Sequence, residues 1–380
     1  MTALSHPPAW AMRGMIGCAM ALTAIGLTAI ASAVYDPALP LGLGREAVAQ
    51  LQWAALALIA GLIAARVPFA VYASAGVPAY AVAVVLIAGM AVLAALQSPL
   101  VPRIKGQANW LVLGPVRVQP VEFVKLLLLL AMAGFCAWPG FSAARLLHVA
   151  VAAAMALLPI ALIAREDLGS ALTLLPMVAA ILVAAGTRWW MLLLGVVLAA
   201  AVVAGGVATL PREGPKSYQW RRIDAWLDPE RYQAAEAFQA ERSLRSIGNG
   251  GWTGQGFAQG DQNRLGWVPE KHTDMISSVI GEEGGYVAMQ TVILLFLGLG
   301  LCALALAAAV PLPGARLVLA GGAGLLIGQM AINLMVATRM MPVTGVTLPL
   351  ISYGGSSLLA SWLLLGLMAS AARARGGGAP

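Results

Sequence analysis

The chain has 380 residues, of which 60% are hydrophobic and only 10% are charged, and its formal net charge is +7. The mean hydropathy of +0.84 is far above that of a soluble domain, which needs a polar shell around its core. The apolar runs are unbroken and do not alternate with a period of two, which excludes a β-barrel. The composition therefore predicts an all-α polytopic membrane protein.

A helical span needs about 20 apolar residues, so we expect about ten transmembrane helices. They lie near residues 13–33, 47–66, 72–96, 119–138, 146–164, 169–187, 189–209, 276–309, 315–338 and 350–371. Most connections are short, which predicts antiparallel neighbours. One connection is much longer: residues 210–275 form a large loop between spans 7 and 8, within a single membrane domain that covers 1–380.

The charges predict the orientation. If the N-terminus is inside, the segments on that side hold no acid, and their basic residues are Arg13, Arg66, Arg145, Arg188, Arg316, Arg373 and Arg375. This positive-inside pattern places both termini in the cytoplasm and the large loop outside. The high isoelectric point thus reflects topology, and no nucleic-acid partner is expected. All three cysteines lie in predicted spans, so neither a disulfide framework nor a cysteine-ligated metal site is expected.

A pair of charges lies at the start of the fourth span. Pro120 suits the first turn of a helix, and Glu122 and Lys125 then fall on one face of that helix, three residues apart. An ion pair just inside a membrane is costly unless it is satisfied or used. The spacing alone leaves two interpretations open: a substrate-binding pair, or a lysine that snorkels to the interface beside a neighbouring acid.

The large loop contains three kinds of sequence. Residues 216–229 and 236–247 have apolar side chains at helical spacing among charges, which predicts two amphipathic helices at the membrane surface. Residues 248–266 are rich in glycine, and the simplest interpretation of that stretch is a flexible connector. The stretch lacks both the dinucleotide fingerprint and the ending of a Walker A loop.

The loop closes with Pro-Glu-Lys-His-Thr-Asp at residues 269–274, directly before the eighth span. One interpretation is structural, with Thr273 or Asp274 capping that helix. The other is catalytic: a carboxylate beside an acceptor hydroxyl is a suitable base for glycosyl or phosphoryl transfer. Nearby cations, or a divalent ion such as Mg²⁺ or Mn²⁺, would stabilise a leaving diphosphate. The loops show no set of residues typical of a covalent hydrolase.

Several motifs together resemble one family. The chain is similar to the SEDS family, the RodA, FtsW and SpoVE group of peptidoglycan glycosyltransferases, on the basis of Ile25-Gly26-Leu27 with Ser32, Gln119-Pro120-x-Glu122-Phe123-x-Lys125, Asp167-Leu168-Gly169, Arg222-Ile223 with Leu227-Asp228-Pro229, Gly250-Gly251-x-x-Gly254-x-Gly256, Pro269-Glu270-x-His272-Thr273-Asp274, Gly281-Glu282-Glu283, Pro342-Val343-Thr344-Gly345 and Ser352-Tyr353-Gly354-Gly355-Ser356-Ser357. The chain departs from the family pattern at Asn109, Val121 and residues 284–286, which bears on substrate contacts.

The resemblance implies polymerisation of lipid II on the outer face of the cytoplasmic membrane, with release of undecaprenyl pyrophosphate. It implies that Asp274 is the catalytic residue, and we expect the substrate to be bound by Glu122, Lys125, Asp167, Arg222, Lys271 and His272. It also implies a class B penicillin-binding protein, a transpeptidase, as partner. The run at 256–262 favours RodA, the elongation member, over FtsW, the division member.

Two further functions compete with this interpretation. A transporter that flips lipid II would need polar or ionisable residues along its path, whereas the acids of this chain cluster at one membrane surface. A scaffold for a partner synthase would explain the fold but not the combination of Glu122, Lys125 and Asp274. An assay for glycan polymer made from lipid II separates the three functions.

Overall fold

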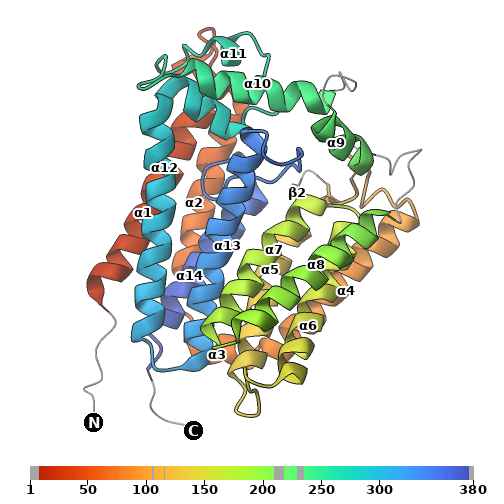
Figure 1. The fold of residues 1–380 in the computed structure, drawn as a ribbon. Coiled ribbons are helices and arrows are strands. Elements are labelled where there is room, and N and C mark those ends of the chain that lie inside the picture. The colour runs from red at the N-terminus through yellow and green to blue at the C-terminus, as the bar shows by residue number, and fades with distance from the viewer. Residues whose placement is uncertain (1–7, 105–106, 115, 209–217, 229–234, 376–380) are drawn as a thin grey trace.

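The computed structural model describes residues 8–104, 107–114, 116–208, 218–228 and 235–375. The described helices form one bundle (Figure 1). The start of α1 and the end of α14 lie at one end of that bundle, and α10 and α11 lie at the other. The charged loop between spans 7 and 8 is therefore built over one end of the membrane domain.

Eight of the described helices are long and apolar enough to cross a membrane. They are α1 (Ala9–Ala33), α2 (Arg45–Arg66), α4 (Gly76–Ala95), α5 (Pro120–Ala137), α6 (Leu146–Ala164), α12 (Ile276–Ala309), α13 (Pro313–Ala337) and α14 (Gly355–Ala372). The predicted sixth and seventh spans correspond to the apolar helices α7 (Leu168–Ala184) and α8 (Trp189–Ala208). The fold class is confirmed, while the count of ten spans stays a prediction.

Two local features differ from the prediction. The third span begins at Gly76 and not at 72, because a short helix, α3 (Phe69–Ser74), precedes it. Pro78 falls in the first turn of α4, where its missing N–H needs no partner. The segment between α4 and α5 contains a small antiparallel hairpin of β1 (Leu111–Leu113) and β2 (Val116–Val118). This hairpin leads directly into α5 and so fixes where the first turn of α5 begins.

The centre of the bundle is α13, which contacts α5, α7, α12 and α14. Close packing against α7 depends on small residues, as is common between membrane helices. A Cβ on Gly324 would come within 2.5 Å of the Cβ of Ala180, and one on Gly328 within 2.4 Å of Pro176. Glycine at both positions lets the two helices approach, and this contact brings the start of α7 beside the chain that follows α13.

The described residues of the large loop contain the two predicted helices, α9 (Tyr218–Leu227) and α10 (Ala235–Asn249), and a short third one that was not predicted, α11 (Asp261–Arg264). Residues 216, 217 and 229 of the predicted helix lie outside the described residues, and α9 ends one residue before Asp228. The helix α10 packs on α12 and touches α13, and it contacts both α9 and α11. The loop is thus packed on the bundle through α10.

The glycine-rich stretch is not a flexible connector, and that expectation is wrong. The helix α12 is interrupted at Gly285, where φ is +66°. The backbone N–H groups released there donate to the stretch, from Tyr286 to the carbonyl of Gly251 and from Val287 to that of Trp252. A Cβ on Gly285 would lie 2.4 Å from the backbone nitrogen of Gly254, so the contact requires glycine. The stretch therefore completes the hydrogen bonding of a broken helix.

Candidate active site

Asp274 lies between the large loop and α12, and only 7% of its surface is exposed. The capping interpretation is wrong, because α12 begins after Met275 and no side chain caps it. The Asp274 carboxylate instead lies 3.1 Å from the Thr273 hydroxyl through Oδ1. The same hydroxyl is 3.1 Å from Oε2 of Glu270. Two carboxylates therefore meet at one hydroxyl, which can donate to only one of them at a time.

Three consecutive carbonyls fix the backbone at Asp274. The carbonyl of His272 accepts from the backbone N–H of Tyr353 at 2.9 Å, and that of Thr273 accepts from the Ser352 hydroxyl at 2.7 Å. The carbonyl of Asp274 accepts from Nδ2 of Asn333 at 2.8 Å. A group held by this many bonds needs little reorganisation during a reaction. The carboxylate is thus preorganised by residues from α13 and from the loop before α14.

Burial, with a smaller contribution from the negative charge of Glu270, raises the pKa of Asp274 from 3.8 to about 6. Hydrogen bonds from the backbone and from Thr273, together with the positive charge of Arg222, act in the opposite direction. A carboxylate with a pKa near 6 is mostly ionised at neutral pH yet is a stronger base than an ordinary aspartate. These properties suit a general base.

Arg222 is the predicted substrate-binding residue that the structure brings to Asp274. It lies on α9, and its Nη1 donates to the carbonyl of Thr344 at 3.4 Å. The Thr344 hydroxyl is buried and has no hydrogen-bond partner among the described residues. His272 presents its ring edge-to-face to Tyr353, with the centroids 5.5 Å apart. Arg222 is therefore near enough to the carboxylate to lower its pKa, and it contacts a residue whose hydroxyl is unused.

Lys271 points toward α11. Its Nζ donates to the carbonyl of Asn263 at 2.7 Å. Burial lowers the pKa of Lys271, and the charges of Glu283 and Glu282 partly offset this effect. Glu282 accepts from the backbone N–H groups of Gln262 and Asn263 at 2.8 and 3.2 Å, so the start of α11 is tied to α12. In this arrangement Lys271 fastens the loop, and its role in substrate binding stays a prediction.

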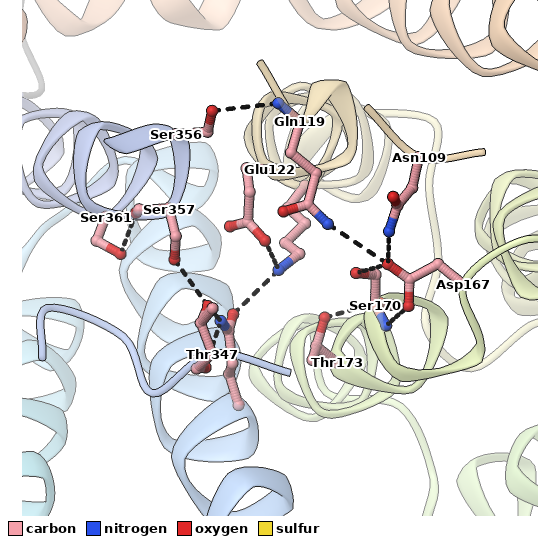
Figure 2. Close-up of polar contacts among 12 residues, drawn as sticks. Asn109, Gln119, Glu122, Asp167, Ser170, Thr173, Thr347, Ser356, Ser357 and Ser361 are labelled. Carbon is pink, nitrogen blue, oxygen red and sulfur yellow. Dashed lines mark hydrogen bonds and ion pairs between the residues drawn. The ribbon is translucent and has the colours of Figure 1, made fainter. Parts of the chain in front are cut away.

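The predicted ion pair of α5 is confirmed (Figure 2). Nζ of Lys125 lies 2.8 Å from Oε1 of Glu122, and it also donates to Oε1 of Gln329 at 3.1 Å. The snorkelling interpretation is wrong, because Lys125 is only 2% exposed. Nε2 of Gln329 donates in turn to the carbonyl of Thr347 at 3.0 Å. The pair therefore connects α5, through Gln329 of α13, to the loop at 338–354, which also forms hydrogen bonds to the backbone beside Asp274.

Asp167 caps α7 and is joined by a hydrogen bond to Gln119, the residue before α5 (Figure 2). It accepts from the backbone N–H and the hydroxyl of Ser170 at 3.0 and 2.8 Å. Asn109 donates to it at 3.1 Å and Gln119 at 3.5 Å. The Oδ1 of Asn109 is buried without a partner among the residues that the structure describes. Asp167 is thus structurally engaged, and substrate binding by it stays a prediction.

Two polar residues of α13 were missed by the sequence interpretation. Gln329 holds Lys125, and Asn333 holds both the carbonyl of Asp274 and that of Val346, each at 2.8 Å. A signal for them exists: they are four residues apart, hence on one face, in a helix whose only other polar side chain is that of Arg316 in its first turn. Together with the loop at 338–354, these two side chains connect Asp274, Arg222 and the Glu122–Lys125 pair.

An apolar cavity of about 730 Å³ lies next to this site, and the sequence interpretation did not foresee it. It lies between α6, α7 and α8, where its lining includes Ala156, Leu172 and Leu192. Trp220 and Ile223 of α9 line it together with Pro342. Arg222 lies between these two residues of α9 in the sequence. A hydrophobic chain in the cavity would therefore end beside the polar site.

Binding of a divalent cation by the protein alone would need several carboxylate, imidazole or thiolate groups close together. No group of three His, Cys, Asp or Glu residues with metal-binding geometry occurs among the described residues. Mg²⁺ commonly takes only one or two protein carboxylates and completes its shell with water and substrate phosphate oxygens. The described side chains thus hold no complete protein site, and binding of a divalent cation stays a prediction.

The fold and the site define a multi-pass membrane protein with a buried carboxylate of raised pKa and an apolar cavity that the helix α9, which carries Arg222, borders. Residues 12–376 match the cell cycle protein family of FtsW, RodA and SpoVE. The chain is 34% identical to the probable peptidoglycan glycosyltransferase FtsW of Halorhodospira halophila over 84% of this chain and 79% of that protein. It is 30% identical to the FtsW of Marinobacter nauticus, covering 93% of this chain and 88% of that protein.

Two solved structures share the fold over nearly their whole lengths. One is a chain of a peptidoglycan synthase complex that coordinates polymerization and crosslinking, with a TM-score of 0.76, 32% identity, and coverage of 95% of this chain and 97% of that chain. The other is the rod shape determining protein RodA of Thermus thermophilus, with a TM-score of 0.66, 29% identity, and coverage of 96% and 98%. The chain therefore belongs to the FtsW, RodA and SpoVE family, the SEDS family, and is a peptidoglycan glycosyltransferase.

Proposed function

We propose that this chain polymerises lipid II into glycan strands and releases undecaprenyl pyrophosphate. The observation that carries the proposal is the position of Asp274, whose raised pKa suits a base, beside a helix that also borders an apolar cavity. A polyprenyl chain is apolar and fits a cavity between membrane helices, whereas its diphosphate needs a cation at the cavity end. Arg222 supplies that cation, and Asp274 then faces the sugars.

The reaction needs one proton acceptor and one leaving group. Asp274 takes the proton from the acceptor sugar hydroxyl, and the oxygen attacks the anomeric carbon of the donor sugar. The bond from that carbon to the diphosphate oxygen breaks, and its electron pair leaves with undecaprenyl pyrophosphate. Arg222 offsets the charge that develops on the diphosphate. Thr273 and Glu270 keep the base in place and its pKa high.

The cavity argues against a transporter of the lipid headgroup. A charged headgroup that crosses the bilayer needs polar or ionisable residues along its path, and the described lining of this cavity has no ionisable side chain. The buried Lys125 is neutralised by Glu122 within the bundle. A site at one surface, with an apolar cavity for the lipid chain, is the arrangement of a surface enzyme.

We propose the orientation in which Asp274 is external and both termini are cytoplasmic. Arg13 lies in the first turns of α1 and Arg373 directly follows α14, and these two helix ends lie opposite α10 and α11 (Figure 1). The positive-inside rule assigns the arginine-rich end of a membrane protein to the cytoplasm. The test is a single cysteine introduced at position 249 or 375, both exposed, of a variant without its native cysteines. External reagent should label position 249 directly and position 375 only after permeabilisation, and the reverse pattern would overturn the orientation.

The cellular role and the partner belong to the same proposal. The glycine-rich run at 256–262 favours elongation, whereas the curated relatives named above are FtsW proteins, which favours division. Depletion distinguishes the two roles, since loss of elongation rounds the cells and loss of division makes filaments. The similarity to a chain of a peptidoglycan synthase complex supports a class B penicillin-binding protein as partner.

The test of the enzyme proposal is polymerisation of lipid II by the purified chain, with and without a cognate class B penicillin-binding protein, and with a chelator in a parallel reaction. Glycan polymer visible on a gel is the expected product. A scaffold would give no polymer under any condition, and a transporter would move lipid II across vesicles without lengthening it. Loss of polymer on chelation, restored by Mg²⁺ or Mn²⁺, would establish that the reaction requires a divalent cation.

A further inference from the structure

A second cavity, of about 940 Å³, lies at the end of the bundle opposite Asp274. Its lining comes from the ends of α2, α5 and α14, the start of α13, and the short helix α3 (Figure 1). The ends of spanning helices mark the boundary between hydrocarbon and water, so the cavity lies at the level of the lipid headgroups. Its volume is in the upper part of the range of about 300–1,000 Å³ that small-molecule sites occupy.

The charge of this cavity is entirely positive. Arg66, Arg373 and Arg375 line it, and no Asp or Glu is among its described lining residues. Arg373 donates to the carbonyl of Ala65 at the end of α2, so part of its guanidinium is engaged. The side chains of Arg66 and Arg375 make no hydrogen bond or ion pair with any residue that the structure describes. Two cations therefore border the cavity without a counter-ion from the described chain.

The two uncharged polar side chains that line the cavity, Tyr72 and Ser370, both have hydrogen-bond partners. The chain breaks its helix between α2 and α3, and the Tyr72 hydroxyl donates to the carbonyl of Ala64 at 2.9 Å. The Ser370 hydroxyl donates to the carbonyl of Val67 at 2.6 Å. The rest of the wall is largely apolar and includes Leu130 and Val318. A ligand that suits this cavity has an anionic part and an apolar part.

We propose that this cavity binds an anionic glycerophospholipid of the cytoplasmic leaflet, with its phosphate between Arg66 and Arg375. Guanidinium groups bind phosphate oxygens in pairs of parallel hydrogen bonds, and basic pockets between membrane helices on the cytoplasmic side suit such headgroups. The glycerol and the first acyl carbons lie along the apolar wall at Leu130 and Val318. A water-soluble phosphate would use the arginines but leave that wall exposed to water. The assignment to this leaflet rests on the proposed orientation.

The experiment measures lipid retention and does not depend on activity. The full chain is reconstituted in nanodiscs of equal parts phosphatidylglycerol and phosphatidylethanolamine, extracted in mild detergent, and analysed by native mass spectrometry. The double variant Arg66→Gln/Arg375→Gln is compared with Arg145→Gln/Arg188→Gln. The control removes two exposed arginines that lie at the same end of the bundle but do not line the cavity.

The double variant loses two guanidinium contacts to the phosphate, and a hydrogen bond to a charged group contributes a factor of about ten or more, so the variant should lose roughly a hundredfold in retained phosphatidylglycerol. The control should retain it as the parent does, and soluble glycerol phosphate should not displace it. Equal loss in both variants would show diffuse attraction of lipids around the bundle and overturn the proposal. Displacement by glycerol phosphate, or retention of phosphatidylethanolamine in equal amount, would also overturn it.

Discussion

Replacing Asp274 with Asn should remove activity and at the same time make the folded protein more stable at neutral pH. Asn keeps the shape of the side chain and can still accept from Thr273, but it takes no proton from a sugar hydroxyl. General base catalysis contributes a factor of about 10² to 10⁴, so turnover should fall at least about a hundredfold. The stability gain arises because Asp274 is a buried charge.

The size of that gain follows from the pKa. A rise from 3.8 to about 6 corresponds to roughly 3 kcal/mol by which folding disfavours the ionised form. Because the pKa in the folded state is the higher one, the penalty is fully present above a pH of about 6 and disappears below about 4. The Asn variant has no such penalty. Its stability advantage over the parent should therefore be largest at alkaline pH and vanish in acid.

The assay pairs polymer formation from lipid II with thermal unfolding in detergent, followed by tryptophan fluorescence at about pH 4 and about pH 8. Asp261→Asn is the matched control, since Asp261 is an exposed acid of the same loop. The control should polymerise normally and show no pH-dependent gain. Near-parental polymerisation by Asp274→Asn would refute the catalytic assignment, and equal thermal stability of variant and parent at both pH values would refute the burial argument.

Four other outcomes are expected. The turnover of the parent should fall about tenfold per pH unit below a pH of about 6, as the base becomes protonated; a flat profile down to about pH 5 would contradict this assignment. Lys125→Met should destabilise the fold by about 3–5 kcal/mol, because Glu122 is left as a buried unpaired charge. The double variant Lys125→Met/Glu122→Gln should restore the melting temperature. The lipid II kinetics of this double variant then report whether the pair binds substrate. Gly285→Ala should lower thermal stability and polymerisation, because φ is +66° and the glycine-rich backbone leaves no room for a Cβ, whereas Gly89→Ala, with open space around it, should have neither effect. Ala179→Phe should narrow the apolar cavity and raise KM for lipid II with unchanged melting temperature; an unchanged KM would exclude the cavity as the site of the lipid chain.

The sequence by itself determined the class of fold and the family. Apolar runs long enough to span a bilayer leave the backbone one option, the helix, because every polar backbone group must be satisfied within the run. The span at 276–309 was predicted with the same limits as α12. The pair of Glu122 and Lys125 was also predictable, since a separation of three residues in a helix places two side chains on one face. Both inferences depend only on local geometry.

Only the tertiary structure decided which residues share a site. Asp274, Arg222 and the Lys125 pair are far apart in the sequence, and their relation depends on α13 and on the loop at 338–354. Local spacing suggested that Asp274 caps α12 and that residues 248–266 are a connector. Both expectations were overridden by long-range hydrogen bonds, from Asn333 in the first case and from the broken helix at Gly285 in the second. The raised pKa of Asp274 likewise depends on burial, and burial is set by elements distant in the chain.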